Sequence, residues 1–219
     1  MAEAPTRILI ADDHRTFAEL FSMGLEREPD LEAVGHAHTA AEAIQLTESL
    51  QPDIVIMDVR LGDGDGIEVT AQLTERYADL CVIILTGHPD PSVVSRAARA
   101  GACGFLPKGG ALAAMLHALR SARRGSLVLP PEMLELMTQS AMPPAAAAPA
   151  VPSLTPGELE VLELLGHGLN PRTIAHRTGR SVEECRALLA GVMTKLGAHS
   201  QLEAVVTANR YGLISVGTQ

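Results

Sequence analysis

The sequence predicts a two-domain α/β protein, in which a doubly wound, five-stranded parallel sheet is followed by a smaller, all-α domain of four helices. The first half of the chain alternates short β-branched segments with amphipathic, Ala-rich segments, which is typical of βαβ units. A Pro- and Ala-rich stretch follows, and after it the β-branched segments end while helix-capping sequences recur. The length of 219 residues also suits two domains of ordinary size.

Five strands are expected from the β-branched segments. They are Arg7–Ala11, Leu31–Gly35, Ile54–Asp58, Cys81–Thr86 and Gly104–Leu106. Two of the helices between them begin at capping-box sequences, Thr39-x-x-Glu42 and Asp65-x-x-Glu68, which satisfy the free N–H groups of a first helical turn. The last helix of this half is expected over Ala111–Arg124, because cations and then Gly125 make a good helix end.

The second half is predicted to be helical throughout. Capping sequences at Thr155, Ser181 and Ser200 mark three of its four expected helices. We therefore expect residues 1–125 to form the first domain and residues 153–219 the second. Residues 126–152 form the linker, with a short helix over Glu132–Gln139 before the Pro/Ala-rich segment.

Composition excludes several classes of protein. The formal charge of −9 argues against an electrostatic grip on nucleic acid by the whole chain, and only 2% of residues are aromatic, which disfavours binding of single strands by stacking. The three cysteines, Cys81, Cys103 and Cys185, have no metal-ligand spacing and suggest no disulfide framework. No segment approaches the roughly 20 apolar residues of a membrane span. We expect a reduced, cytoplasmic protein that is not exported and has no membrane partner.

Carboxylates end two of the predicted strands. Asp12 and Asp13 follow the first strand, and Asp58 ends the third. Because parallel strands open their carboxyl ends onto one crevice, these side chains should lie together there. They would repel one another without a cation, and all-oxygen ligation of this kind suits Mg²⁺. The sequence therefore predicts a magnesium site built for phosphoryl chemistry.

Two further strand ends carry Thr86, a hydroxyl donor, and Lys108, a mobile cation. With these residues in this order, the segment from Arg7 to Arg124 resembles the receiver domain of two-component response regulators. Asp12 or Asp13 alone would suit a helix N-cap, and Lys108 alone would suit a surface charge. Those interpretations leave the joint placement of these residues unexplained. The resemblance implies a flavodoxin-like fold.

The resemblance also implies roles for the pocket residues. Asp58 is the phosphoacceptor for a sensor histidine kinase, and Asp13 and Asp58 bind Mg²⁺ directly while Asp12 does so through water. The backbone carbonyl of Arg60 completes the protein ligands. On phosphorylation Thr86 would move toward the phosphoryl group, and Phe105 would turn inward. The residues to which the resemblance gives a role are Asp12, Asp13, Asp58, Arg60, Thr86, Phe105 and Lys108. Self-dephosphorylation is the only catalysis expected, so the chain is not predicted to be an enzyme.

Other features near the pocket have ordinary interpretations. The segment from Gly62 to Gly66 resembles a Ca²⁺ loop only superficially, because it lacks the ligand spacing and the terminal Glu, and we expect a turn with Asp65 as a helix cap. Gly62 stands where related receivers often have Pro. His14 and His88 are expected to be solvated loop residues without a role.

The C-terminal half resembles the helix-turn-helix domain of the LuxR/NarL type. The resemblance rests on the segment from Leu154 to Leu162, on Gly168-Leu169-Asn170 and on Lys195-Leu196-Gly197. It implies that a recognition helix over Ser181–Leu196 enters the major groove of double-stranded DNA. The residues expected to face the core of the domain at helical spacing are Cys185, Leu189, Val192 and Leu196.

The expected outer face of this helix is poor in groups that read bases. It carries Arg186, Ala187, Ala190, Gly191 and Thr194, of which only Arg186 can read guanine, while Glu183 and Glu184 oppose the approach of phosphates. Six cations balance six acids between Ser153 and Gln219. The candidate DNA-binding residues are Arg172, Arg177, Arg180, Arg186 and Lys195.

Two hypotheses therefore stand. The first is a phosphorylation-controlled transcription factor that binds DNA as a homodimer or as a heterodimer with a second regulator. The second is a regulator whose C-terminal domain binds protein, with Ala187, Ala190 and Gly191 allowing close approach of a partner helix.

Overall fold

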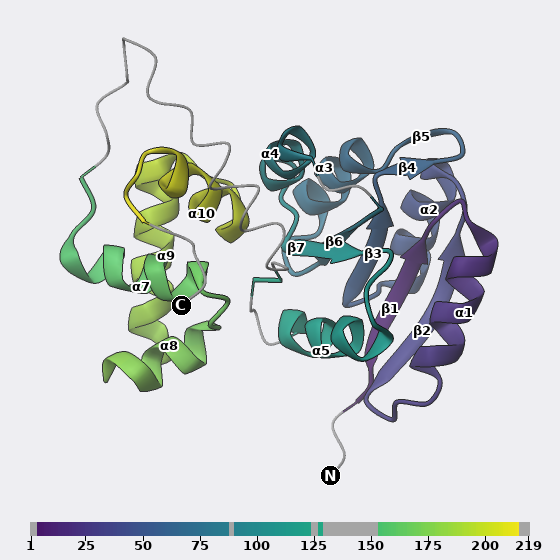
Figure 1. The fold of residues 1–219 in the computed structure, drawn as a ribbon, viewed down its shortest axis with the longest axis horizontal. Coiled ribbons are helices and arrows are strands. Elements are labelled where there is room, and N and C mark those ends of the chain that lie inside the picture. Colours follow the sequence, from purple (N-terminus) through teal and green to yellow (C-terminus); the bar gives the residue numbers. More distant parts are fainter. Residues whose placement is uncertain (1–3, 88–89, 124–126, 129–152, 215–219) are drawn as a thin grey trace.

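A computed structural model describes residues 4–87, 90–123, 127–128 and 153–214 of the chain. Its main sheet is parallel, with the strand order β2-β1-β3-β6-β7 (Figure 1). These strands are β1 (Thr6–Ala11), β2 (Leu31–Ala37), β3 (Ile54–Asp58), β6 (Cys81–Thr86) and β7 (Gly104–Pro107). All five predicted strands are confirmed, with ends that differ from the expected ones by at most two residues. The order reverses at β1 and β3, as in flavodoxin-like folds.

Helices cover both faces of the sheet because alternate residues of each strand point to opposite sides. The helices α1 (Arg15–Leu25) and α5 (Leu112–Arg123) pack on one face, over side chains such as Ile10 and Ile56. The opposite face, which includes Val55 and Ile84, is covered by α2 (Ala40–Leu50), α3 (Gly66–Arg76) and α4 (Pro91–Arg99). The predicted doubly wound parallel sheet is therefore confirmed.

The loop after β3 contains a short hairpin that the sequence did not predict, formed by β4 (Arg60–Leu61) and β5 (Gly64–Asp65). The expected role of Asp65 is confirmed, because its carboxylate accepts a hydrogen bond from the N–H of Ile67 at 2.8 Å and caps α3. Gly66 is required next to it, since a Cβ there would lie 1.8 Å from the carbonyl oxygen of Asp58. The start of α3 is thereby held directly against the end of β3.

The C-terminal part contains the four expected helices. They are α7 (Pro156–Gly166), α8 (Pro171–Thr178), α9 (Val182–Leu196) and α10 (Gln201–Arg210). The capping boxes at Thr155 and Ser181 are both complete, with hydrogen bonds in each direction between the cap and the residue three positions later. None of the described helices has the length and apolar character needed to cross a membrane.

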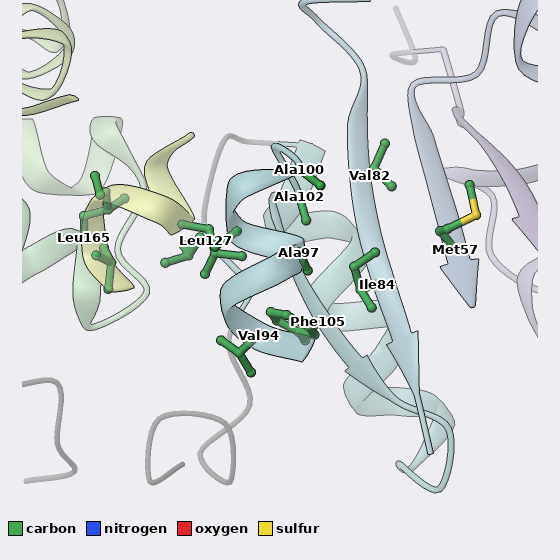
Figure 2. Packing of buried hydrophobic residues seen from close by; sticks show 14 of the residues in the cluster. Met57, Val82, Ile84, Val94, Ala97, Ala100, Ala102, Phe105, Leu127 and Leu165 are labelled. Carbon is green, nitrogen blue, oxygen red and sulfur yellow. The ribbon is translucent and has the colours of Figure 1, made fainter. Parts of the chain in front are cut away.

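The two parts of the molecule touch along α4. Helix α10 packs against α4, and the hydroxyl of Ser200 donates a hydrogen bond to the carbonyl of Ala98 at 3.0 Å. Leu127 lies between α4 and the C-terminal helices, near Leu165 (Figure 2). The helix expected over Glu132–Gln139 lies outside the described residues, as does the helix end expected at Gly125.

The expectation that the cysteines form no disulfide is wrong. Cys81 and Cys103 are bonded to each other, with their Cα atoms 5.7 Å apart, while Cys185 is free and buried. The two residues are 22 positions apart in sequence, but Cys81 begins β6 and Cys103 directly precedes the neighbouring β7, where the N–H of Cys103 donates to the carbonyl of Val82. The pairing of β6 with β7 brings the two cysteines together, and their spacing along the sequence does not predict this contact.

Candidate functional site

The predicted pocket residues meet at one edge of the sheet. Asp12 directly follows β1, Asp58 ends β3, Thr86 ends β6 and Lys108 directly follows β7. Backbone pairing holds the last two together, because the N–H of Lys108 donates to the carbonyl of Thr86 at 2.9 Å. The joint placement expected from the sequence is therefore what the parallel register produces.

Lys108 joins the acidic side chains. Its Nζ lies 2.7 Å from Oδ2 of Asp58 and 2.9 Å from Oδ2 of Asp12. The Asp12 side chain is fully buried and that of Asp58 is 9% exposed, so both charges are largely removed from water. A buried carboxylate pair of this kind needs a cation, and the ammonium of Lys108 supplies one.

Burial is the main influence on the titration of this pair. It raises the pKa of Asp58 above its ordinary value, and the nearby charge of Asp12 adds to the rise, while Lys108 partly offsets it. Burial also lowers the pKa of Lys108, but the hydrogen bonds from its ammonium to Asp58 and Asp12 outweigh that effect and leave the pKa raised. Lys108 therefore stays charged at neutral pH.

The donor set fits a hard divalent cation. Ligand atoms of Asp12, Asp13, His14 and Asp58 lie within 4.8 Å of one another. Oδ2 of Asp12 is buried and, despite its short distance to Lys108, has no hydrogen bond of acceptable geometry with the described residues. One lone pair of a buried carboxylate is thus left for an additional cation, and carboxylate oxygens are the ligands that Mg²⁺ prefers.

His14 belongs to this cluster, although the sequence suggested a solvated residue without a role. Its Nδ1 lies 2.7 Å from Oδ1 of Asp13 and 3.2 Å from Oδ1 of Asp12, while its side chain is 68% exposed. Its backbone N–H also donates to Asp12 at 2.9 Å. The available clue was its position immediately after the two aspartates. His88 lies outside the described residues.

The resemblance implies two switch residues, Thr86 and Phe105. Thr86 is buried at the end of β6. A backbone hydrogen bond from Arg60, which is not one of these two residues, lowers the pKa of Asp58 slightly against the effect of burial. Phe105 is fully buried and packs near Val94 and Ala97 of α4 (Figure 2). In this conformation the ring is already inside the protein, so an inward turn from the surface is not available to it.

Comparison with known proteins places this chain in a family. The response regulator receiver domain family matches residues 8–120. The chain belongs to the response regulator family. Two curated relatives from Bacillus subtilis (strain 168) are 29% identical to it: the transcriptional regulatory protein YdfI, over 96% of this chain and 98% of its own length, and the transcriptional regulatory protein LiaR, over 95% and 99%.

Solved structures of response regulators share the fold. A LuxR-family two-component response regulator from Aurantimonas sp. SI85-9A1 is 29% identical, covers 62% of this chain and 97% of its own, and has a TM-score of 0.59. The response regulator ChrA of a heme-sensing two-component system is 25% identical over 97% of this chain and 100% of its own, with a TM-score of 0.53. The match to the Aurantimonas protein spans 62% of this chain, whereas the match to ChrA spans nearly the whole chain, including the additional C-terminal helices.

The basic residues of the C-terminal helices fall into two groups. Arg172, Arg177 and Arg186 are exposed and form no salt bridge with the residues that the structure describes. By contrast, Arg180 lies 2.6 Å from Glu160, and Lys195 lies 2.7 Å from Glu158. These two cations join α9 and its N-terminal turn to α7, so the structure gives them partners within the domain.

The outer face of α9 is smaller than expected. Arg186, Ala187, Ala190 and Thr194 are exposed, and the buried residues expected on the inner face are confirmed for Cys185, Leu189 and Val192, with Leu196 partly buried. Gly191 was wrongly placed outside. A Cβ there would lie 3.0 Å from Oε1 of Glu158, so this residue allows α7 and α9 to approach each other.

Proposed function

We propose that this response regulator accepts a phosphoryl group on Asp58 from a sensor histidine kinase and thereby controls transcription through its C-terminal helices. One observation supports the first part of this proposal. At the ends of three strands, Nζ of Lys108 lies within 3 Å of a carboxylate oxygen of both Asp58 and Asp12. We place this exchange in the cytoplasm.

The pocket supplies the groups that phosphoryl transfer needs. An oxygen of Asp58 attacks the phosphorus of a phosphohistidine, and the P–N bond breaks as its electron pair returns to the imidazole. Lys108 and the hydroxyl of Thr86 bind oxygens of the transferred group, and positioning and electrostatics provide the catalysis. Asp12, Asp13, Asp58 and the carbonyl of Arg60 would hold Mg²⁺, which when bound offsets the negative charge of the phosphoryl oxygens. Self-dephosphorylation is the only further catalysis that we propose.

Phosphorylation is tested with acetyl phosphate and Mg²⁺. Mass spectrometry of the treated full-length protein should show one added phosphoryl group, and peptide mapping should place it on Asp58. Asp58→Asn should abolish the addition. The matched control Asp53→Asn, an exposed carboxylate just before the other end of β3, should be labelled like the wild type. A stable adduct on another residue, or labelling of Asp58→Asn to the same extent, would contradict the proposal.

DNA binding is proposed for the C-terminal helices. Support comes from the four-helix arrangement, from relatives whose names describe transcriptional regulation, and from the exposed positions of Arg172, Arg177 and Arg186. An RcsB structure that shows two dimers bound to DNA shares the fold at 23% identity, with a TM-score of 0.57. Because Arg180 and Lys195 are paired with glutamates, we expect exposed arginines to carry most phosphate contacts, and a dimer to double them.

The salt dependence of DNA binding distinguishes these arginines. Loss of a phosphate contact in Arg172→Ala should lower the slope of log K against log salt by about 1 for each contact removed. Arg186→Ala should cost about 1–3 kcal/mol at a guanine-containing site and relax specificity there. Arg210→Ala, an exposed cation at the end of α10, is the control and should leave both quantities unchanged. Equal behaviour of all three variants would exclude the proposed interface.

Protein binding by the same domain is the second candidate. It is favoured by Glu183 and Glu184, which are exposed at the start of α9 where they would repel phosphates. Gly191 faces α7 and is not part of the outer face of α9, so Ala187 and Ala190 remain for close contact with a partner helix. Phosphorylated protein that shows no salt-dependent affinity for DNA would favour this function.

A further inference from the structure

Two cysteines form a cross-link that the phosphoryl pocket does not use. Cys81 begins β6 and Cys103 directly precedes β7, so their bond lies at the end of these strands opposite Thr86 and Lys108. Both side chains are partly exposed, whereas Cys185 is fully buried. The pair is therefore open to small thiols and disulfides in solution, and Cys185 is not.

The cross-link adjoins the segment that leaves the receiver. The carbonyl of Cys103 accepts a hydrogen bond from the N–H of Val128 at 3.3 Å, and the N–H of Phe105 donates to the carbonyl of Val128 at 2.7 Å. Val128 thus pairs in parallel with Gly104 at the edge of the sheet. The fit is tight, because a Cβ on Gly104 would lie 2.3 Å from the carbonyl oxygen of Val128.

Contacts with the C-terminal helices begin on both sides of the same site. Leu127, next to Val128, belongs to the buried cluster that includes Leu165 of α7 (Figure 2). The carbonyl of Ala98, which accepts from Ser200 at the N-cap of α10, lies near the end of α4, five positions before Cys103. Cys103 therefore stands between the two segments of the receiver that touch the C-terminal helices.

We propose that Cys81 and Cys103 are a reversible redox site whose oxidant is a low-molecular-weight disulfide, and that oxidation tightens the receiver edge that carries the C-terminal helices. One cysteine thiolate attacks a sulfur of the small disulfide and releases one small thiolate. The second cysteine thiolate then attacks the mixed disulfide, which forms the Cys81–Cys103 bond and releases the second small thiolate. The two protons lost by the cysteines are taken up by the released thiolates.

Physical arguments support this role. In the bonded form the two Cα atoms are 5.7 Å apart, which is the usual separation for a disulfide, so the folded receiver accommodates the bond. The bond closes a loop of 22 positions and restricts the unfolded chain. Disulfides in cytoplasmic proteins of ordinary organisms are mostly transient and redox-sensing, which suits a partly exposed pair. This input does not require phosphorylation of Asp58, so either proposal can fail without the other.

The site is tested on the full-length protein equilibrated with defined ratios of reduced and oxidised glutathione. After alkylation, peptide mapping of the wild type should show a Cys81–Cys103 link that appears with oxidised glutathione and disappears with excess reduced glutathione. Oxidation should raise the melting temperature by roughly 5–15 °C. Hydrogen exchange at the amides of Phe105 and Val128 should slow by about tenfold in the oxidised form.

Variants separate this site from other thiol chemistry. Cys81→Ser and Cys103→Ser should each lose the melting-temperature increase, while Cys185→Ser should keep it and keep the link. A missing link at every glutathione ratio, or a link that excess reduced glutathione does not open, would overturn the proposed reversible site. A link that forms without slowing exchange at Phe105 and Val128 would overturn its proposed effect on the receiver edge. The wild-type titration gives an answer even if a variant does not fold.

Discussion

Asp58 carries an unfavourable charge in the folded protein. Its carboxylate is 9% exposed and lies with Asp12 around one ammonium, that of Lys108. Burial and the charge of Asp12 raise its pKa above the value expected in the unfolded chain, even though Lys108 acts in the opposite direction. The residue proposed to accept the phosphoryl group therefore lowers stability when it is ionised.

Asp58→Asn should stabilise the protein at neutral pH in the absence of divalent ions. A group whose pKa is raised by folding contributes less stability as the pH rises from its unfolded pKa through its folded pKa. The variant lacks this loss, so its free energy of unfolding should exceed that of the wild type by on the order of 1 kcal/mol at pH 7. The difference should vanish below about pH 4. Urea denaturation at both pH values measures it, and a destabilised variant at pH 7 would contradict the expectation.

Glu158 shows the opposite behaviour. Its hydrogen bond with Lys195, followed by that with the backbone of Thr155, lowers its pKa. The resulting stabilisation is fully present above the unfolded pKa, near 4.3, and is lost as the pH falls through the lower, folded value. Glu158→Gln keeps a capping residue but removes the charge, so its unfolding free energy should depend less on pH between about 3 and 5.

Glu160→Gln is the control for that measurement. Glu160 is 49% exposed and pairs with Arg180 at the surface, where ion pairs contribute little. Its pH dependence in acid titrations followed by circular dichroism should match the wild type. If Glu158→Gln also matches the wild type, the ion pair of Glu158 with Lys195 does not stabilise the C-terminal helices.

Helix α3 and strand β3 meet without space for a side chain. The N–H of Gly66 donates to the carbonyl of Val59 at 2.9 Å, and Asp65 caps the helix while it also forms an ion pair with Arg96 of α4. This junction links the end of β3, which carries Asp58, to two helices. We therefore expect a change at this junction to move the Asp58 carboxylate.

Gly66→Ala should disrupt this junction. A Cβ would lie 1.8 Å from the carbonyl oxygen of Asp58, so the helix or the strand end must move. We expect a loss of about 2 kcal/mol or more in unfolding free energy, together with weaker labelling by acetyl phosphate. Gly87→Ala is the matched control, since its Cβ would have no neighbour within 4 Å, and it should change stability by less than about 0.5 kcal/mol. Equal stability of both variants would show that the junction is not tight.

Within the described residues, the receiver and the C-terminal helices contact each other at α4 and at Leu127. Helix α10 lies on α4 (Figure 1), and Leu127 extends the buried cluster of the receiver toward α7 (Figure 2). In this arrangement Arg186 on α9 remains exposed. Docking of α10 on the receiver therefore leaves the proposed DNA-binding face uncovered.

Leu127→Ala should loosen this arrangement. Leu127 is 5% exposed, and removal of its side chain leaves a cavity between the receiver and the C-terminal helices. Small-angle scattering should then show a larger radius of gyration than for the wild type. Leu20→Ala, which changes a leucine of α1 that is 64% exposed, should leave the radius unchanged. An unchanged radius in both variants would mean that Leu127 does not hold the two parts together.

Local sequence patterns were sufficient to predict much of the structure. The five strands, the caps at Thr155 and Ser181, and the placement of Asp12, Asp58 and Lys108 at strand ends were all predicted. Each rests on residues near one another in sequence or on a general property of parallel sheets. The β4–β5 hairpin was missed because its two-residue strands are too short to show a period.

The sequence by itself determined the fold class, the positions of Asp12, Asp58 and Lys108 at strand ends and the four C-terminal helices, because side-chain periodicity and capping are local properties. Only the tertiary structure decided that Cys81 bonds to Cys103, that Lys195 pairs with Glu158 and that Gly191 faces α7. These contacts join residues that are distant along the chain. They exist because sheet order and helix packing bring separate segments into register, and no local pattern encodes that proximity.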